Sequence, residues 1–525
     1  MRAPFSRTLC ELLFEQAQRR PQHAAVITRG RTHSFAALAA RVRALAGALH
    51  ARGVRRGTRV ATLIDNRIEL LEAMFAAASL GAAVVPLSTW SSRAELDFLL
   101  RDARAHTLLT LARLGERDFA GDVRALREAL PQLEQVVVVD GTAGDGETAY
   151  AQLFGAARDP LLAPGDGASA GDPLVVLYTS GSSNRPKAVP LLHHAAIENG
   201  FNIGERQGLG PADRVFVPIP LFWSYGAVNA LPAALSHGAT LVLQQRFEPQ
   251  EALTLIQTHR CTAIYTLPAI TNALLGAPGF HPARTRTLRT GLTIGTAQDV
   301  MRAARELGAA RICNIYGSTE TYGNCCVTPH HWALERRARC QGPPLPGVTI
   351  RVRDPVSGQP CLPGQVGAVE VRGYLTPGYD GDSARFNTQV FSADGWFRTG
   401  DLAALDADGC LVYAGRRSEM IKRSGINVSP AEIEEVLQQH PAVGLAGVTG
   451  TPDAARDEAI VAFIVCRPGA VLTREALLAH CRAHLSRYKL PDRIEFRDAL
   501  PLTVTGKLLR MELQALALTL HEEAR

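Results

Sequence analysis

Short apolar runs alternate with stretches of helical apolar periodicity from residue 8 to residue 294. Residues 35–53, 68–80 and 227–236 carry apolar side chains at helical spacing, whereas short runs rich in Val, Ile and Leu are typical of buried strands. This alternation predicts layered α/β units with parallel strands, and a second unit of the same kind after residue 190. The predicted strands are 24–27, 60–63, 83–86, 108–109, 136–139, 174–177, 214–218, 240–243, 263–266 and 292–294.

The pattern changes in the later part of the chain. Residues 140–172 form an irregular connection, and 343–417 hold short β-rich runs between Gly and Pro turns, which predicts a small β subdomain. Ser429 and Glu432 flank Pro430 in the pattern of a capping box at a helix start. Residues 426–525 contain two further helices and two strands. We therefore expect an α/β fold with a large N-terminal domain, residues 1–417, and a small, mobile α+β C-terminal domain, residues 418–525.

The composition is that of a folded protein. Of the 525 residues, 46% are hydrophobic, which supports a large core and excludes a disordered chain. The net charge of +6 is small for this length, and the charged residues are interspersed, so nucleic-acid binding is not indicated.

Ten scattered cysteines without a CxxC pair favour buried thiols in a reducing compartment. The start of the chain lacks a signal-peptide core, and the apolar stretch 73–85 is too short to span a bilayer, so we expect a cytoplasmic protein with no membrane span.

A polar loop follows the apolar run 174–177. It combines hydroxyl groups with Gly181 and Lys187, and backbone N–H groups, hydroxyls and a cation are what a phosphate-binding loop needs. The loop is not a Walker A sequence, because it lacks the second Gly before the Lys. Taken alone, it also fits a polar surface turn after a strand. Its candidate phosphate ligands are Thr179, Ser180, Gly181, Ser182, Ser183 and Lys187.

Four further polar clusters follow along the chain, at residues 314–320, 394–401, 415–425 and 501–507. In the first, Glu320 is suited to share a Mg²⁺ ion with phosphates, although a solvated Glu after a strand-to-turn connection is the plainer interpretation. In the second, Asp401 follows a Gly turn and suits a ribose diol. The last cluster ends in Lys507, just before a predicted helix at 508–513.

These five clusters, in this order, resemble the adenylate-forming superfamily, which includes acyl- and aryl-CoA synthetases, adenylation domains of nonribosomal peptide synthetases and firefly-type luciferases. The resemblance runs from about residue 9 to about residue 515. It implies that the first loop holds the β/γ-phosphates and that Lys507 is a mobile lysine reaching the α-phosphate. It places a hinge at Ser418 and the thiol-side loop around Gly425. The other implied roles are adenine lining for Gly295, Thr296, Ala297, Asn314, Tyr316 and Gly317, an α-phosphate contact for Thr319, a Mg²⁺ ligand in Glu320, and ribose binding by Asp401 with Arg416 nearby.

The resemblance implies a reaction in two halves. A carboxylate attacks the α-phosphorus of ATP with Mg²⁺ present, pyrophosphate leaves, and the acyl-adenylate then passes its acyl group to the thiol of CoA. The small domain rotates between the two halves. The cofactors expected are therefore ATP, Mg²⁺ and CoA, or the phosphopantetheine of a carrier protein.

Several positions depart from the family's usual pattern. Ser183, Asn184 and Ala188 stand where the first loop usually has Thr, Gly and Gly, but the hydroxyl and Lys187 remain, so we expect phosphate binding to remain. Ser418 replaces the usual Asp or Lys of the hinge. Trp223 stands where many acyl-CoA synthetases carry His, and it is interpreted as an aromatic gate, with a core residue as the alternative.

The residues of the predicted acid site indicate an apolar acid. No Asp lies between residues 218 and 230 to pair with an amino acid's ammonium, and leaving that charge unpaired in an aromatic pocket would be costly. Trp223, Tyr225 and Tyr322 favour an aromatic, alicyclic or medium-chain acid, with Ser224 and Gly226 in the same motif. CoA is the leading acceptor, because no carrier domain follows the last motif. The alternatives are a separate acyl carrier protein and a luciferase-like or non-catalytic protein, and either a monomer or a homodimer is expected.

Overall fold

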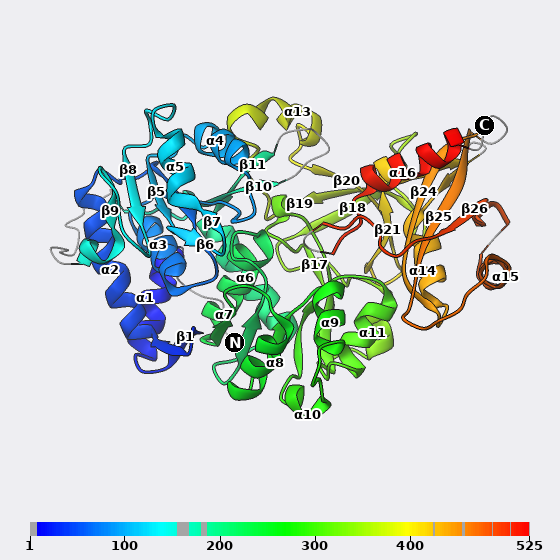
Figure 1. Ribbon diagram of the computed structural model, residues 1–525, viewed down its shortest axis with the longest axis horizontal. Coiled ribbons are helices and arrows are strands. Elements are labelled where there is room, and N and C mark those ends of the chain that lie inside the picture. Colours follow the sequence, from blue (N-terminus) through cyan, green and yellow to red (C-terminus); the bar gives the residue numbers. More distant parts are fainter. Residues whose placement is uncertain are drawn as a thin grey trace.

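The computed structural model describes residues 8–154, 167–179, 186–423, 426–453, 457–485, 487–503 and 506–523. Two large sheets and a four-stranded sheet build the large N-terminal domain, and a further sheet builds the small C-terminal domain at one end of the molecule (Figure 1). The α/β fold class is confirmed, with a large N-terminal and a small C-terminal domain.

The first large sheet has seven strands in the order β11-β10-β4-β3-β5-β8-β9. Its strands are parallel except β11, which pairs antiparallel with β10. Apolar residues fill these strands because both faces are covered. The bounds are β3 Arg59–Leu63, β4 Ala83–Pro86, β5 Thr107–Thr110, β8 Gln135–Val138, β9 Thr148–Ala149, β10 Pro173–Thr179 and β11 Lys187–Leu192, and a short hairpin, β6 Arg113–Leu114 and β7 Arg117–Asp118, follows β5.

The second large sheet has eight strands in the order β17-β16-β15-β14-β12-β13-β1-β2. The predicted second α/β unit is confirmed, but its sheet also takes in β1 from the start of the chain, which pairs parallel with β13. The edge strands β2 and β17 are antiparallel and were not predicted. The bounds are β1 Ala24–Thr28, β2 Arg31–Ser34, β12 Arg214–Val217, β13 Thr240–Leu243, β14 Ala263–Tyr265, β15 Thr290–Thr293, β16 Arg311–Tyr316 and β17 Cys326–Val327.

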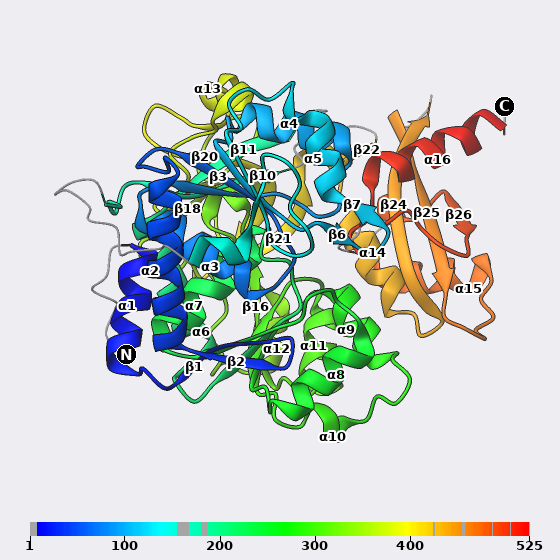
Figure 2. The same ribbon diagram turned by 60° about the vertical axis from the view of Figure 1, so that its left-hand side comes forward.

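Helices pack between and around the two sheets. Figure 2 shows α1, α2 and α3 side by side, and one continuous apolar core joins them to both sheets. Thr8 and Ser92 open α1 and α4 with capping boxes that satisfy the first N–H groups. The bounds are α1 Leu9–Arg19, α2 Phe35–Ala51, α3 Ile68–Ser79, α4 Arg93–Asp102, α5 Phe119–Arg127, α6 His193–Gln207, α7 Leu231–His237, α8 Pro249–Thr258, α9 Pro268–Leu275, α10 Pro282–Thr285, α11 Ala297–Arg305, α12 Leu334–Arg339 and α13 Asn387–Val390.

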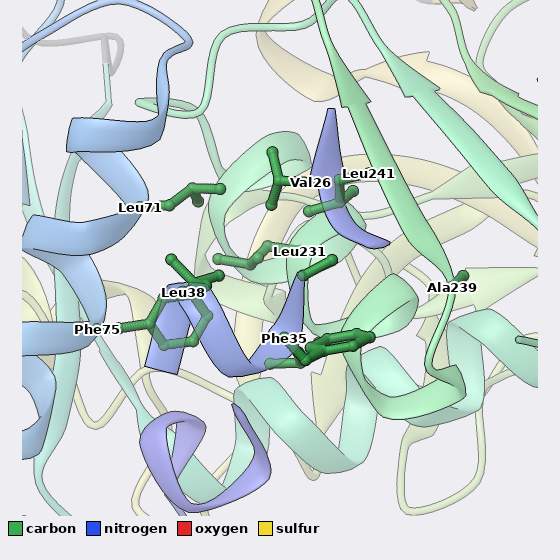
Figure 3. Close-up of a pocket in the computed structure, with 10 residues that line it drawn as sticks. Val26, Phe35, Leu38, Leu71, Phe75, Leu231, Ala239 and Leu241 are labelled. Carbon is green, nitrogen blue, oxygen red and sulfur yellow. The ribbon is translucent and has the colours of Figure 1, made fainter. Parts of the chain in front are cut away.

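A small void lies inside this core. It is lined only by apolar side chains, including Phe35, Phe75 and Leu231, which come from three helices (Figure 3). Its volume is about 10 Å³, which is room for about one water molecule without polar partners. The void is therefore a packing defect and not a ligand site.

The predicted β subdomain is confirmed as a four-stranded antiparallel sheet, β18-β19-β20-β21. The small domain follows as a five-stranded sheet, β23-β22-β25-β24 with β26 paired to β25, in which α14 and α15 cover one face and α16 the other. The bounds are β18 Thr349–Arg353, β19 Gly367–Arg372, β20 Phe397–Leu405, β21 Leu411–Arg416, β22 Ile421–Arg423, β23 Ile426–Val428, β24 Val443–Asp453, β25 Asp457–Cys466, β26 Arg493–Phe496, α14 Pro430–Gln439, α15 Arg474–His484 and α16 Arg510–Glu523.

Three predicted elements differ from the structure. The helix expected at 227–236 begins as a π-helical turn, Tyr225–Ala230, before α7, because Pro232 has no N–H to bond in an α-helical ladder. Only half of the predicted capping box is present: Ser429 Oγ accepts from Glu432 N at 3.4 Å, but the Glu432 carboxylate binds Lys489 Nζ at 2.5 Å. The last hundred residues hold four strands, β23 to β26, where two were predicted; in β26 the alternating charged residues hide the apolar pattern.

The cysteines fit the expectation from the sequence. All ten are free thiols, and eight of them are buried. Among the helices described, none is long and apolar enough to cross a bilayer.

Candidate active site

Two of the predicted clusters, and the segment at 295–297, lie where parallel strands end. Gly295 to Ala297 follow β15, and Gly317 to Glu320 follow β16, both at the carboxyl ends of neighbouring strands of the second sheet. The predicted phosphate loop follows β10 of the first sheet. Ligands of open α/β sheets bind outside the carboxyl ends of the strands. The fold therefore gives these separate sequence clusters a common position.

The two ends of the phosphate loop are held together by a strand pair. Thr179 ends β10 and lies opposite Lys187, the first residue of β11. The Lys187 ammonium lies 5.0 Å from the ring centroids of both Tyr379 and Phe386. These aromatic faces steady the cation while its other side stays open to an anion. Ser180, Gly181, Ser182 and Ser183 lie outside the described residues.

Thr319 and Glu320 lie on a short helical turn directly after β16. Glu320 Oε1 accepts a 2.8 Å hydrogen bond from Tyr379 Oη, and Thr319 Oγ1 donates to Ser224 Oγ at 3.3 Å. A Cβ added to Gly317 would lie 2.5 Å from the Gly323 carbonyl oxygen, so only glycine fits this tight turn.

The Glu320 carboxylate is a hard oxygen ligand and suits Mg²⁺. The described residues contain no cluster of three His, Cys, Asp or Glu side chains able to hold a metal by themselves. Glu320 therefore fits an ion that it shares with the oxygens of a bound nucleotide, as Mg²⁺ at phosphate sites usually is.

Asp401 and Arg416 face each other across β20 and β21. Asp401 Oδ2 accepts from Tyr316 Oη at 2.7 Å, and Arg416 Nε lies 3.1 Å from Asp401 Oδ1. Burial raises the pKa of Asp401, while Arg416 and Tyr316 oppose that shift. Tyr316 also lies close to Tyr413, with ring centroids 5.9 Å apart. A carboxylate with a fixed orientation and neighbouring aromatic rings is suited to a nucleoside.

Lys507 comes from the small domain and reaches this cluster. Desolvation, followed by the charge of Arg416, lowers the pKa of Lys507, and Asp401 and Glu419 oppose the shift. Gly506 has φ +78°, and a Cβ there would lie 2.4 Å from the Ala269 Cβ of α9. The glycine thus lets the lysine loop press against the large domain.

The predicted adenine segments have different surroundings. Thr296 caps α11 and pairs with Asp299 in a capping box. The carboxylate of Glu435, on α14 of the small domain, faces the Ala297 N–H, which opposes the rise that burial gives the pKa of Glu435. Asn314 is fully buried, and its amide donates to the Cys340 carbonyl at 3.1 Å. Asn314 therefore stabilises the backbone of β16 from within the core. Residues 295–297 instead lie at the start of helix α11.

The aromatic residues of the predicted acid site separate into two groups. Trp223 is partly exposed, and Tyr225 lies against Tyr265 with ring centroids 5.1 Å apart. Tyr322, in contrast, is fully buried, and its hydroxyl accepts the Leu192 N–H at 2.8 Å. This places Tyr322 in the core. Gly226 packs against the backbone of Pro220, and Gly425 lies outside the described residues.

A cavity of about 370 Å³ lies beside Trp223, within the size range of ligand sites. The sequence did not predict its outer residues Trp90 and Arg246, nor the contacts made by Tyr379 and Glu435. Each lies far along the chain from its partners, and no local motif marks it. The lining residues are Asp65, Asn66, Thr89, Trp90, Leu114, Arg117, Phe119, Pro218, Pro220, Phe222, Trp223, Gln245, Arg246, Phe247, Leu267, Ala269 and Ile270.

Two family models and a curated relative match this chain. Residues 13–379 match the family model described as AMP-binding enzyme, and residues 432–507 match the AMP-binding enzyme C-terminal domain. The indoleacetate–CoA ligase of Aromatoleum aromaticum is 32% identical over 518 residues, covering 97% of this chain and 98% of that protein.

Solved structures agree over nearly the whole chain. The anthranilate CoA ligase AuaEII in complex with anthranoyl-AMP has a TM-score of 0.88 and 27% identity, and the match covers 99% of both chains. The O-succinylbenzoate coenzyme A synthetase (MenE) of Bacillus subtilis, in complex with ATP and magnesium ion, has a TM-score of 0.80 and 28% identity. That match covers 96% of this chain and 98% of the other.

Proposed function

Because the chain belongs to the AMP-binding enzyme family, it is an ATP-dependent ligase that activates a carboxylic acid and transfers it to CoA, and we propose that its acid is apolar. The observation that carries the proposal is the grouping of Glu320, Asp401 and Lys507, which respectively follow β16, lie on β20 and come from the small domain. Tyr316 at the end of β16 donates to Asp401, the charge of Glu320 acts on the pKa of Asp401, and the charge of Asp401 acts on the pKa of Lys507.

The first half-reaction places a carboxylate against the α-phosphate of ATP. A carboxylate oxygen attacks the α-phosphorus, the bond to the bridging oxygen breaks, and pyrophosphate leaves. Lys507 and Lys187 lower the repulsion between these anions, and Asp401 orients the ribose. Glu320, together with the phosphates, would hold Mg²⁺, which would offset charge on the leaving group. Positioning and electrostatic stabilisation thus do most of the work.

The second half-reaction transfers the acyl group. The thiol sulfur attacks the acyl carbonyl as its proton passes to solvent, the carbon–oxygen bond to the phosphate breaks, and AMP leaves. No electrons are exchanged with a redox partner. We infer that the domains join at the turn Arg417–Glu419, between β21 and β22, and that rotation there withdraws Lys507 for this step.

An apolar acid fits the surroundings of Ser224 and Tyr225. Ser224 Oγ accepts from Thr319 Oγ1, so this segment lies next to the α-phosphate contact. Tyr225 is buried against Tyr265, and no acidic side chain lies between Pro218 and Ala230. An ammonium would find no counter-charge here, whereas an aromatic, alicyclic or medium-chain acid would lose little on leaving water.

CoA is the proposed acceptor, and a separate acyl carrier protein is the alternative, because both present a phosphopantetheine thiol. Free thiols at all ten cysteines support a reducing, cytoplasmic location.

A reaction panel tests the proposal. The protein is incubated with ATP, Mg²⁺ and one acid from a panel of aromatic, alicyclic and C4 to C12 fatty acids and free amino acids, each with and without CoA, and the products are identified by mass spectrometry. Acid-dependent pyrophosphate–ATP exchange ranks the acids. We expect acyl-CoA and AMP from apolar acids. Exchange with amino acids alone would contradict the proposed acid class, and acyl-AMP without acyl-CoA would favour the carrier protein.

A further inference from the structure

The segment 379–386 flanks the proposed phosphate-binding lysine with aromatic rings at both of its ends. The Lys187 ammonium lies 5.0 Å from the ring centroids of Tyr379 and Phe386. The Tyr379 hydroxyl also donates to Glu320. The position of this one segment therefore acts on both the phosphate-binding cation and the proposed Mg²⁺ ligand.

The segment covers β11, which is the edge strand of the first sheet. Asp380 N donates to the Ala188 carbonyl at 3.0 Å, and Ala188 N donates to Ser383 Oγ, also at 3.0 Å. Ala188 follows Lys187 on β11, so these two bonds fix the segment to the strand that carries the lysine. Arg59 Nη2 adds an ion pair to Asp380 Oδ2 at 2.6 Å. The segment thus takes the place of the neighbouring strand that an edge strand lacks.

A single carboxylate joins this segment to β10 as well. Asp102 Oδ2 accepts the hydroxyl of Tyr178 at 2.7 Å, and Asp102 Oδ1 accepts the backbone N–H of Asp382 at 2.9 Å. Tyr178 precedes Thr179, the last residue of β10 and a candidate phosphate ligand. Burial, followed by the bond to Asp102, raises the pKa of Tyr178, so its hydroxyl stays a donor. Asp102 therefore bonds to β10 with one oxygen and to the segment 379–386 with the other.

The place of Asp102 in the fold is unfavourable for a charge of its own. Asp102 is the last residue of α4, which lies beside β10 and β11 (Figure 1), and the carbonyls at a helix C-terminus disfavour a negative charge. Gly381 has φ +57°, and a Cβ there would lie 2.5 Å from Asp102 Oδ1. Only glycine lets the backbone of the segment approach the carboxylate this closely. Local preference does not account for this contact, which points to a role in the site.

We propose that Asp102 is a positioning residue for ATP binding, because it fixes the segment 379–386 to β10 and thereby holds the aromatic rings around Lys187. Without this carboxylate the Tyr178 hydroxyl loses its acceptor, and the bond between β10 and the segment is lost. The rings act on the residues that face the phosphates and Mg²⁺, so the effect falls on ATP and not on the acid or the thiol. This inference rests on the proposed function.

The test measures ATP binding apart from the chemistry. Isothermal titration calorimetry with ATP and Mg²⁺, in the absence of acid, gives the Kd for ATP. For Asp102→Ala we expect this Kd to rise about tenfold, the range of a lost hydrogen bond to a charged group. Asp102→Asn keeps one acceptor oxygen, so its Kd should lie between those of the wild type and Asp102→Ala.

Tyr178→Phe removes the same bond from the other side. It should raise the Kd about threefold, and it should add little to Asp102→Ala in the double variant, because the two changes share one interaction. A matched control is Asp97→Ala. Asp97 lies on the same helix but pairs with Arg101, at 2.7 Å. It should leave the Kd for ATP unchanged.

Kinetics separate positioning from general damage. In Asp102→Ala the KM for ATP in pyrophosphate exchange should rise, while the KM for the acid and the rate of thioester formation from supplied acyl-adenylate stay unchanged. An equal slowing of thioester formation would overturn the proposal, because it would show a general loss of structure.

An unchanged Kd for ATP in Asp102→Ala would also overturn the proposal, and if that variant does not fold, Tyr178→Phe decides in the same way. A wild-type protein that binds ATP but shows no acid-dependent exchange would instead refute the proposed function, and the binding comparison would still test Asp102.

Discussion

Tyr379 donates a 2.8 Å hydrogen bond to Glu320 Oε1, and the ring of the same tyrosine lies 5.0 Å from the Lys187 ammonium. One side chain thereby links the proposed Mg²⁺ ligand to the proposed phosphate-binding lysine. Tyr379 and Glu320 lie 59 positions apart in the chain. The backbone N–H of Thr376 also donates to the Glu320 carbonyl, at 2.9 Å. The segment after β19 thus fixes the orientation of the Glu320 carboxylate.

Replacing this tyrosine should weaken metal use. Tyr379→Phe keeps the ring but leaves Glu320 without its donor, and loss of a metal ligand's hydrogen-bond partner typically costs 10- to 100-fold in metal affinity or activity. We expect about tenfold more Mg²⁺ to be needed for half-maximal pyrophosphate exchange. Titration of Mg²⁺ at fixed ATP measures this. An unchanged Mg²⁺ midpoint would show that the bond does not position Glu320.

Lys507 gives a pH-dependence prediction. Its ammonium form offsets phosphate charge, and desolvation, followed by the charge of Arg416, lowers its pKa, so this form is lost at a lower pH than in a lysine of ordinary pKa. As pH rises, kcat/KM for ATP should therefore begin to decrease at a lower pH than a lysine of ordinary pKa would give. Lys507→Arg, which stays protonated, should move that fall to higher pH. Lys489→Arg, on the same domain but paired with Glu432, serves as the control. An identical alkaline limb in all three proteins would exclude Lys507 as the titrating group.

Glu435 gives a prediction about the domain arrangement. Its carboxylate faces the Ala297 N–H at the start of α11, where a helix favours negative charge by about 0.3–1 kcal/mol. Glu435→Gln should slow adenylation about two- to fivefold and leave transfer from supplied acyl-adenylate unchanged. Glu432→Gln removes a carboxylate of the same helix that bonds within the small domain. If both variants behave alike, or both half-reactions slow equally, the contact does not stabilise this arrangement.

Much of the fold follows from local pattern. Buried parallel strands such as Val60–Leu63 are continuous apolar runs because both their faces are covered, and the sequence predicted them. Edge strands such as Arg31–Ser34 face water and carry polar residues, so the same pattern cannot mark them. The pairing of β1 with β13 joins residues 215 positions apart and has no local signal.

The same distinction holds for the site. Glu320 and Asp401 lie in compact motifs, so the sequence alone identified both as candidate site residues. Their orientation depends on Tyr379 and Tyr316, which the fold brings to them from other segments. Tyr322 was expected to contact the acid because it lies beside a motif. The structure instead places it in the core. Position in a motif predicts proximity, whereas side-chain direction depends on packing.

The central claim is that Lys507 serves adenylation and not thioester transfer. The most direct measurement is the rate of each half-reaction in Lys507→Ala, by pyrophosphate exchange and by thioester formation from supplied acyl-adenylate. We predict that Lys507→Ala loses adenylation by at least about 100-fold, the scale of a lost transition-state donor, and keeps transfer to CoA. Equal losses in both half-reactions would contradict the account.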